Sequence, residues 1–313
     1  MKTSIGTWAY SIGPYAKKPV DFDTVCQKLA ALGYDALELG AFPPHPNPDD
    51  YPTKESRREL VEKIHGYGLV ISGIAANLWG EKLLNTDDPS KYIAEFRKNC
   101  EFAVDLGIHG IRVDTVQPPT IFAEVDYATA KNRLVSTWKI CADIAAEYGL
   151  QVSWEAEPGF AFNKPSEIME ILAAIPNQNF GFLYDTCHAQ IISVVGARQN
   201  GVKETFACQT QFLKMVGPRI NHIHLIDSDN SCHKDAAGND ETSAHPPFGL
   251  GLLNFDVIVP ELLKYHPYSA WWTNDLCFWD NAWEATEVCK TFMDRLKRRY
   301  QPGNPQEAGR LDS

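Results

Sequence analysis

The sequence lacks the patterns that identify several large classes of protein. In its 313 residues no stretch approaches the roughly 18 consecutive apolar residues that a helix needs to cross a bilayer. The first residues, Met-Lys-Thr-Ser-Ile-Gly-Thr-Trp, have no basic region followed by an apolar one, so we expect no signal peptide. There is no G-x-G-x-x-G and no G-x-x-x-x-G-K-S/T, which argues against an open doubly wound sheet with a phosphate-binding loop.

Paired cysteines and an excess of positive charge are absent as well. The eight cysteines are scattered and no two form a C-x-x-C pair, which predicts reduced thiols and a cytoplasmic location. Asp and Glu (40) outnumber Lys and Arg (29), which gives a formal net charge of −11. An acidic surface repels phosphate backbones and anionic lipid, so we expect neither a nucleic-acid nor a membrane partner.

Short apolar runs do occur, and they alternate with amphipathic stretches at helical spacing along the whole chain. Several of the helical stretches end at a glycine, such as Gly33 or Gly149, which is a common C-terminal stop. The expected strands are 4–9, 36–41, 69–76, 110–114, 151–157, 180–185, 220–227 and 269–276. The expected helices are 22–32, 54–67, 88–106, 128–148, 166–174, 205–216, 255–265 and 282–299.

Eight repeats of strand and helix indicate parallel βαβ units, and eight such units close a barrel. We therefore predict an α/β fold, a (β/α)₈ TIM barrel in a single domain over residues 1–300. The Pro- and Gly-rich segment 301–313 is expected to be a flexible C-terminal tail. A long loop after the seventh strand, 228–253, is the kind of segment that often forms a lid or an interface.

Acidic residues and a histidine stand at the ends of the last four expected strands, which is where a TIM barrel has its active site. Glu155, Asp185, His224 and Asp275 converge on one point if they face inward. Three oxygen donors and one nitrogen donor favour one divalent metal ion, Mn²⁺ first and then Mg²⁺ or Co²⁺. Zn²⁺ remains an alternative, although it prefers more nitrogen or sulfur ligands.

Other side chains near strand ends are candidates for binding substrate. Trp8 and Trp79 could stack on the apolar face of a sugar, although such rings are also ordinary core or rim residues. Asp114 could bind a hydroxyl or support a ligand, and Asp227 could orient His224 or bind substrate. Glu157 shares a strand face with Glu155 and is the alternative ligand from that strand.

The motifs Glu155-x-x-Pro158-Gly159, Asp185-Thr-Cys-His188 and His222-x-His224-Leu-x-Asp227 resemble those of the sugar phosphate isomerase/epimerase superfamily, the xylose-isomerase-like barrels. The resemblance covers nearly the whole chain. It implies metal ligation by Glu155, Asp185 and His224, and a contact between His188 and a substrate hydroxyl. The fourth ligand in that family is usually Glu, which its epimerases also use as one of two acid/base groups, and here the position is Asp275.

The resemblance implies a metal-dependent sugar isomerase or epimerase with Glu155 and Asp275 as catalytic groups. It would remove a proton next to the carbonyl of a free sugar or keto-sugar, through a metal-stabilised enediolate. The alternative is a lyase that uses the same enolisation, either an inosose-type dehydratase or an enzyme that eliminates from a 3-keto-glycoside. The expected partner is a small sugar or polyol. Homo-oligomers are common among such barrels, and the sequence leaves the oligomeric state open.

Overall fold

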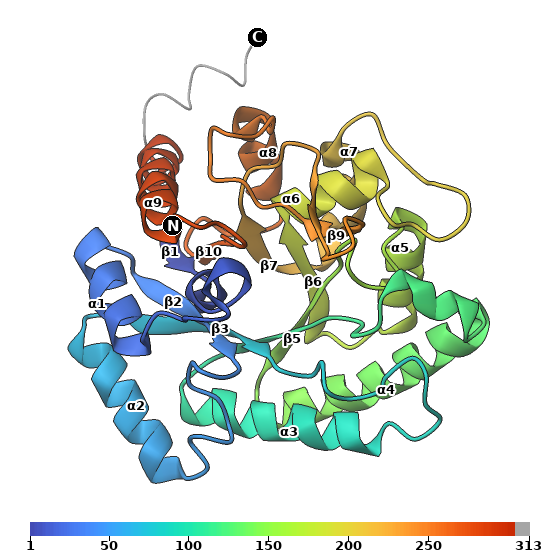
Figure 1. Cartoon of the computed structure of the whole chain (residues 1–313), viewed down its shortest axis with the longest axis horizontal. Helices are drawn as coiled ribbons and strands as arrows, with labels where there is room; N and C mark the ends of the chain where they lie inside the picture. Colours follow the sequence, from blue (N-terminus) through green and yellow to red (C-terminus); the bar gives the residue numbers. More distant parts are fainter. Residues whose placement is uncertain (304–313) are drawn as a thin grey trace.

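The computed structural model describes residues 1–303 and shows a ring of eight parallel strands surrounded by helices (Figure 1). This confirms the predicted (β/α)₈ barrel. Each of the eight expected strands is present, although four of them end one or two residues earlier than expected and the first ends four residues earlier. The strands of the barrel are β1 (Lys2–Ile5), β2 (Ala36–Ala41), β3 (Val70–Ala76), β4 (Gly110–Val113), β5 (Gln151–Glu155), β6 (Phe180–Asp185), β7 (Ile220–Leu225) and β10 (Trp271–Asn274).

Hydrogen bonds join the strands in the order β1-β10-β7-β6-β5-β4-β3-β2. A single parallel bridge between Gly6 and Glu38 connects the two remaining edges and closes the barrel. In the register of the sheet, His224 pairs with Asp185 on one side and with Thr273 on the other. The C-terminal ends of β6, β7 and β10 therefore lie at one level, which is what a shared site at that end requires.

The helices begin and end where local signals place them. Asp21 accepts a hydrogen bond from the backbone N–H of Thr24 and caps α1, and Gly33 ends that helix at φ 80°. Thr53 and Asp126 cap α2 and α4 in the same way. The helices are α1 (Phe22–Leu32), α2 (Lys54–Gly66), α3 (Ser90–Asp105), α4 (Tyr127–Glu147), α5 (Pro165–Ala174), α6 (Thr186–Gln190), α7 (Gln209–Val216), α8 (Phe255–Leu262) and α9 (Ala282–Arg299).

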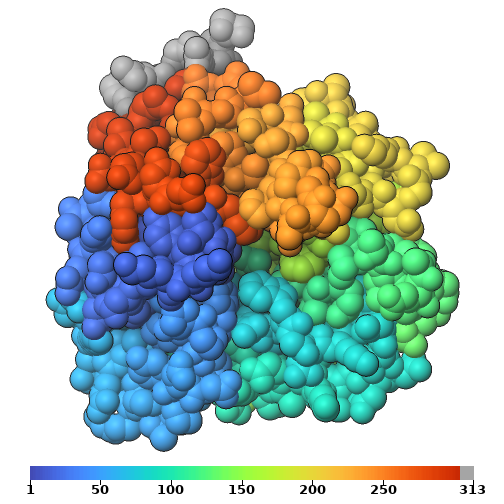
Figure 2. All heavy atoms as spheres, viewed as in Figure 1, coloured from blue at the N-terminus to red at the C-terminus, as the bar shows by residue number. Residues whose placement is uncertain are grey.

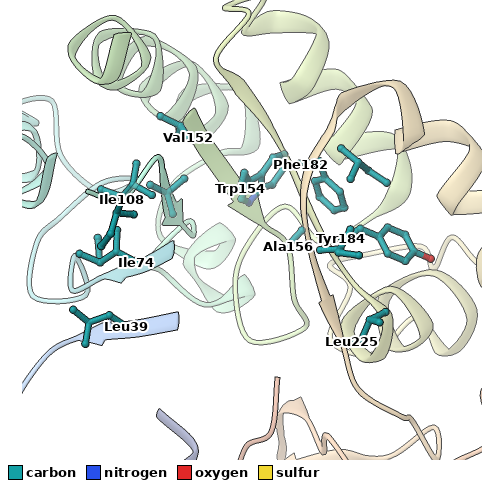
Figure 3. Packing of buried hydrophobic residues seen from close by; sticks show 14 of the residues in the cluster. Leu39, Ile74, Ile108, Val152, Trp154, Ala156, Phe182, Tyr184 and Leu225 are labelled. Atoms are coloured by element: carbon teal, nitrogen blue, oxygen red, sulfur yellow. The ribbon is translucent and has the colours of Figure 1, made fainter. Parts of the chain in front are cut away.

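The main hydrophobic core lies between the barrel and its helices. Trp154, Phe182 and Tyr184 point outward from β5 and β6 (Figure 3), and the indole of Trp154 meets that of Trp138 from α4 edge to face at 5.3 Å. Since side chains alternate along a strand, the outward Trp154 turns its neighbour Glu155 toward the barrel axis. Packing of the apolar face thus fixes where the polar side chain lies.

The long loop after β7 contains an antiparallel hairpin that the sequence did not predict, made of β8 (Cys232–Lys234) and β9 (Asp240–Ser243). The hairpin lies across the end of the barrel near β6 and β7 (Figure 1). Among the described residues no helix is long and apolar enough to cross a membrane. All eight cysteines are free. Apart from 301–303, the expected C-terminal tail lies outside the described residues.

Candidate active site

Four buried side chains meet at the C-terminal end of the barrel, as the strand ends predict. Glu155 ends β5, Asp185 ends β6, His224 lies on β7, and Asp275 follows β10 directly. One donor atom from each of the four residues lies within 4.8 Å of the donor atoms of the others. Their side chains are almost fully removed from solvent, so the cluster sits on the barrel axis beneath the surface.

His224 is held in one orientation by a residue that sequence reasoning did not assign to the site. Its Nε2–H donates to Oε1 of Glu38 at 3.1 Å, which leaves Nδ1 directed at Glu155 Oε1, 2.9 Å away. Glu38 is held in turn by His222 at 2.7 Å and by the hydroxyl of Thr273 at 3.0 Å. Burial alone would lower the pKa of His224, but the charges of Glu38 and Glu155 raise it well above its ordinary value.

Asp185 and Asp275 each use one carboxylate oxygen for structure and direct the other into the cluster. Oδ1 of Asp185 accepts a hydrogen bond of 2.7 Å from the backbone N–H of His188, at the start of α6. Oδ1 of Asp275 accepts a hydrogen bond of 2.5 Å from the indole N–H of Trp8. Oδ2 of Asp275 lies 3.3 Å from Nε2 of His245 and 3.8 Å from Nδ1 of His224. Oδ2 of Asp185 has no hydrogen-bond partner among the described residues. Trp8 thus supports Asp275 as well as lining the space above it.

Several atoms in the cluster have no hydrogen-bond partner among the described residues. They include Oδ2 of Asp185 and Nδ1 of His245. The oxygens of Glu155, Nδ1 of His224 and Nε2 of His245 make ion-pair contacts but no hydrogen bond of good geometry. Buried polar atoms without partners are costly, so a group of them pointing at one another indicates a bound species that satisfies them. Glu155, Asp185, His224 and Asp275 could therefore hold one divalent metal ion.

Arg112 is a second residue that sequence reasoning missed. It lies on β4, and its Nε is 2.7 Å from Oε2 of Glu155. Burial alone would raise the pKa of Glu155, but the charge of Arg112, followed by that of His224, brings it to about 2. No pattern in the sequence marks Arg112. A lone arginine inside an otherwise apolar strand can be assigned to the site only once the structure shows that it faces the carboxylate of Glu155.

Glu157 and His188 form a pair beside the metal-binding cluster, with Oε2 of Glu157 3.9 Å from Nε2 of His188. The hairpin holds both, because Thr242 donates a hydrogen bond to Glu157 and the hydroxyl of Ser243 lies 2.8 Å from Nδ1 of His188. Burial, and then the charge of Glu155, raise the pKa of Glu157 to about 7. Glu157 is thus a carboxyl group that can give or take a proton near neutral pH.

The hairpin loop also brings His245 to the site. Its Nε2 lies 3.3 Å from Oδ2 of Asp275, and the indole N–H of Trp279 donates to its backbone carbonyl at 2.7 Å. Burial alone would lower the pKa of His245, but Asp275 raises it to about 9. Sequence reasoning placed His245 in the long loop without a role, since nothing in the sequence shows that this loop folds back over the barrel.

A cavity of about 500 Å³ opens above the cluster, bounded on one side by the hairpin. Figure 2 shows its mouth as a hollow between the orange atoms of the hairpin segment and the blue and cyan atoms of the segments that follow the first strands. Six of the residues predicted to act in catalysis or binding line this cavity. They are Trp8, Trp79, Glu155, Glu157, His188 and Asp275.

Two residues predicted to bind substrate have other partners in the structure. Asp114 accepts hydrogen bonds of 2.8 Å from the indole N–H of Trp79 and of 2.8 Å from the backbone N–H of Val116, so it orients Trp79. Asp227 accepts hydrogen bonds from the backbone N–H groups of Gly249, Gly251 and Leu253, and it is not among the residues that line the cavity. We therefore do not keep Asp227 among the substrate-binding candidates, because its carboxylate organises the turn before α8.

Comparison with known proteins agrees with the barrel fold. A family model described as the xylose isomerase-like TIM barrel matches residues 26–292. An inosose dehydratase of Bacillus velezensis is 21% identical over 262 residues, which cover 78% of this chain and 77% of that protein. An inosose dehydratase of Yersinia enterocolitica is 24% identical over 228 residues, covering 70% and 68% of the two chains.

Solved structures share the fold over nearly the whole chain. The IolI protein with a bound zinc atom superposes with a TM-score of 0.70 at 17% identity, covering 96% of this chain and 99% of that one. A D-tagatose 3-epimerase-like protein gives a TM-score of 0.69 at 18% identity, with the same coverage. At these identities the likeness is one of fold.

Proposed function

Since this chain belongs to the xylose isomerase-like TIM barrels, we propose that it is a divalent-metal-dependent enzyme that moves a proton next to the carbonyl of a sugar or polyol ketone. The observation that carries the proposal is the convergence of four unlike donors from four strands at the floor of one cavity. Relatives named as dehydratases and epimerases support a reaction of this kind.

The proposed metal ligands are Glu155, Asp185, His224 and Asp275. The donor set of three carboxylates and one imidazole favours Mn²⁺, with Mg²⁺, Co²⁺ or Zn²⁺ as the other choices, and the zinc atom in the IolI protein supports a divalent ion. An ion held there supplies positive charge beside a carbonyl oxygen, which makes the neighbouring C–H bond more acidic.

Glu155 and Asp275 are the proposed acid/base groups because both line the cavity. A carboxylate there could accept a proton from the substrate carbon, while an ion held by the same cluster would stabilise the charge that develops on the substrate oxygen. Returning that proton to the neighbouring carbon gives isomerisation, and returning it to the opposite face gives epimerisation. Asp275 has one methylene less than glutamate, so the substrate carbon must lie closer to the strand end than a glutamate would require.

Elimination is a second candidate, and the pair formed by Glu157 and His188 favours it. A carboxyl with a pKa of about 7 is protonated in a large share of molecules at neutral pH and can protonate a departing hydroxyl. The inosose dehydratases among the relatives support this reaction class. Isomerisation or epimerisation and elimination begin with the same proton removal. They differ in the next step, because the first returns the proton to the sugar whereas the second expels a hydroxyl group.

Incubation of a panel of ketoses and inososes in deuterated water tests the proposal. We expect the metal-loaded protein to introduce deuterium at a carbon next to the carbonyl, detected by mass spectrometry, and Asp185→Asn to abolish both metal content and exchange. Glu62→Gln, an acid-to-amide change on the exposed face of α2, is the matched control and keeps both. A product that differs from the substrate only by the added deuterium indicates isomerisation or epimerisation. A product that has also lost the mass of one water molecule indicates a dehydratase.

If the wild type holds no metal after purification and shows no exchange after any of the four ions is added, the enolisation proposal is wrong.

A further inference from the structure

The cavity above the cluster is larger than a free six-carbon sugar requires. Its volume of about 500 Å³ lies within the range of roughly 300 to 1,000 Å³ that is typical of sites for drug-sized ligands. The inner end is polar and holds the catalytic candidates, so a sugar ring engaged there leaves the outer end of the same cavity to be filled. What lines that outer end therefore indicates what else the substrate carries.

One wall of the outer end is apolar. It is built from the segments that follow β1, β2, β3 and β4, together with the segment after β10, which adjoins the hairpin. Figure 2 shows the blue and cyan atoms on the side of the mouth that faces the hairpin. The aromatic and aliphatic side chains of this wall have few groups that could form hydrogen bonds with hydroxyls, so the wall is poorly suited to a second sugar ring. The side chains of this wall are Ile12, Phe42, Trp79, Pro118 and Phe278.

Trp79 is held as a platform on this wall. Its indole N–H donates to Asp114 at 2.8 Å, and its ring packs against that of Phe42 with 5.4 Å between centroids. Even so, 42% of the residue is exposed, which is unusual for a tryptophan whose polar atom is already satisfied. The ring is therefore fixed in orientation while part of its apolar surface stays open to the cavity.

Phe278 forms the far edge of the wall in a conformation that bulky residues rarely adopt. Its φ is 63°, and its ring stacks on His233 of the hairpin at 4.1 Å. A side chain on Gly13 would meet the phenyl ring of Phe278 at 2.9 Å, so the glycine lets the ring pack tightly against the segment after β1. Strained backbone persists where the surrounding structure requires it, and such positions gather at ligand sites.

We propose that the outer end of the cavity is a subsite for a planar apolar group attached to the sugar, such as the aryl aglycone of a glycoside, with Trp79 as its stacking platform. The inference rests on the proposed function for the position of the sugar ring, and it replaces the free sugar by a glycoside whose ring carries a keto group, because the acetal carbon of a glycoside offers no carbonyl. An aromatic ring stacked on Trp79 is worth roughly a three- to tenfold gain in affinity.

Calorimetric binding of matched glycoside pairs to the metal-loaded protein tests the subsite. The probes are the phenyl and methyl β-glycosides of glucose, galactose and xylose, because each pair differs only in the aglycone. In the wild type we expect at least one phenyl glycoside to bind roughly three- to tenfold more tightly than its methyl partner. Trp79→Ala removes this preference, and Trp79→Phe keeps most of it because a ring remains on the wall.

Trp271→Ala is the matched control, because Trp271 begins β10 and its ring lies at the opposite, N-terminal end of the barrel, so the preference is kept. The proposal is overturned if no phenyl glycoside outbinds its methyl partner, if Trp79→Ala leaves the preference intact, or if a methyl disaccharide gains as much as the phenyl glycoside. The last result would assign the wall to a second sugar.

The subsite and the proposed function fail in different ways. Glu155→Gln abolishes deuterium exchange under the proposed chemistry but leaves the phenyl preference in place, because Glu155 lies at the inner end of the cavity. A phenyl preference without exchange in the wild type would contradict the proposed function alone. Exchange on keto-sugars without any phenyl preference would contradict the subsite alone.

Discussion

The carboxylate of Glu38 holds the imidazole of His224 across the barrel axis, with Oε1 3.1 Å from Nε2. Since a carboxylate can only accept, Nε2 carries a proton, and Nδ1 is the ring nitrogen that faces the cluster of Glu155, Asp185 and Asp275, where a bound metal ion would replace its proton. Glu38 comes from β2 and His224 from β7, so this hydrogen bond joins strands on different sides of the barrel. A carboxylate behind a histidine ligand is a recurrent way to fix its orientation.

Glu38→Gln is expected to weaken metal affinity about 10- to 100-fold, because the amide replaces the charge that orients His224 and raises its basicity. The measurement is the metal dissociation constant by competition with a fluorescent chelator. Glu62→Gln on α2 serves as the surface control and leaves that constant unchanged. An unchanged dissociation constant in Glu38→Gln would show that His224 needs no support from β2.

Metal removal is expected to lower thermal stability. A ligand present at 100 times its dissociation constant stabilises the folded state by about 2.7 kcal/mol. In proteins of roughly 150–250 residues, a change of 1 kcal/mol in the free energy of unfolding shifts the melting temperature by roughly 2–4 °C. We therefore expect excess chelator to lower the melting temperature by several degrees, measured by calorimetry. In Asp185→Asn the same chelator has no effect, because the site is already empty; an equal shift in both proteins would place the ion elsewhere.

Arg112→Met is expected to destabilise the metal-free protein by about 3 kcal/mol at pH 7, because it leaves the buried carboxylate of Glu155 without its cation. In the wild type the pKa of Glu155 is about 2, below its ordinary 4.5. Its ionised form thus stabilises the fold above pH 4.5, and this contribution is lost as the pH falls toward 2.

In Arg112→Met the pKa of Glu155 rises, so protonation relieves the unpaired charge as the medium becomes acidic. Urea unfolding at pH 7 and at about pH 4.5 should therefore show a smaller difference between variant and wild type at the lower pH. Arg97→Met, which removes an exposed partner of Glu147 on α4, controls for loss of a surface ion pair and changes stability by less than about 1 kcal/mol. A difference that grows with acidity would contradict the pairing of Arg112 with Glu155.

If the reaction is an elimination, we expect the ionisation of Glu157 to cause the fall in kcat/KM at high pH. Its pKa is about 7, so the protonated form that can donate to a leaving hydroxyl is lost as the pH rises through 7. We expect kcat/KM for dehydration to fall above this pH, and Glu157→Gln to lower the rate and remove this limb. A profile that keeps its descending limb in Glu157→Gln would assign the titrating proton donor to another group.

Much of the fold follows from local signals in the sequence. Asp21, Thr53 and Asp126 cap helices through their own side chains, and Gly33 ends a helix because a left-handed backbone suits a residue without Cβ. Such signals act over a few residues, so helix positions were predictable to within a few residues. The short helix α6 (Thr186–Gln190) was not predicted at all. The largest error in a helix boundary was at α7, which begins at Gln209 and not at residue 205, and whose N-cap residue makes no side-chain hydrogen bond.

The sequence by itself determined the barrel and the level at which Glu155, Asp185, His224 and Asp275 stand, because parallel strands all end at the same face. Only the tertiary structure decided what surrounds them. Glu38 and His224 are 186 residues apart, and the hairpin that brings Thr242 and its neighbours over the mouth folds back from a loop with no helical or strand periodicity. Contacts of this kind depend on closure of the whole ring, which no local pattern encodes.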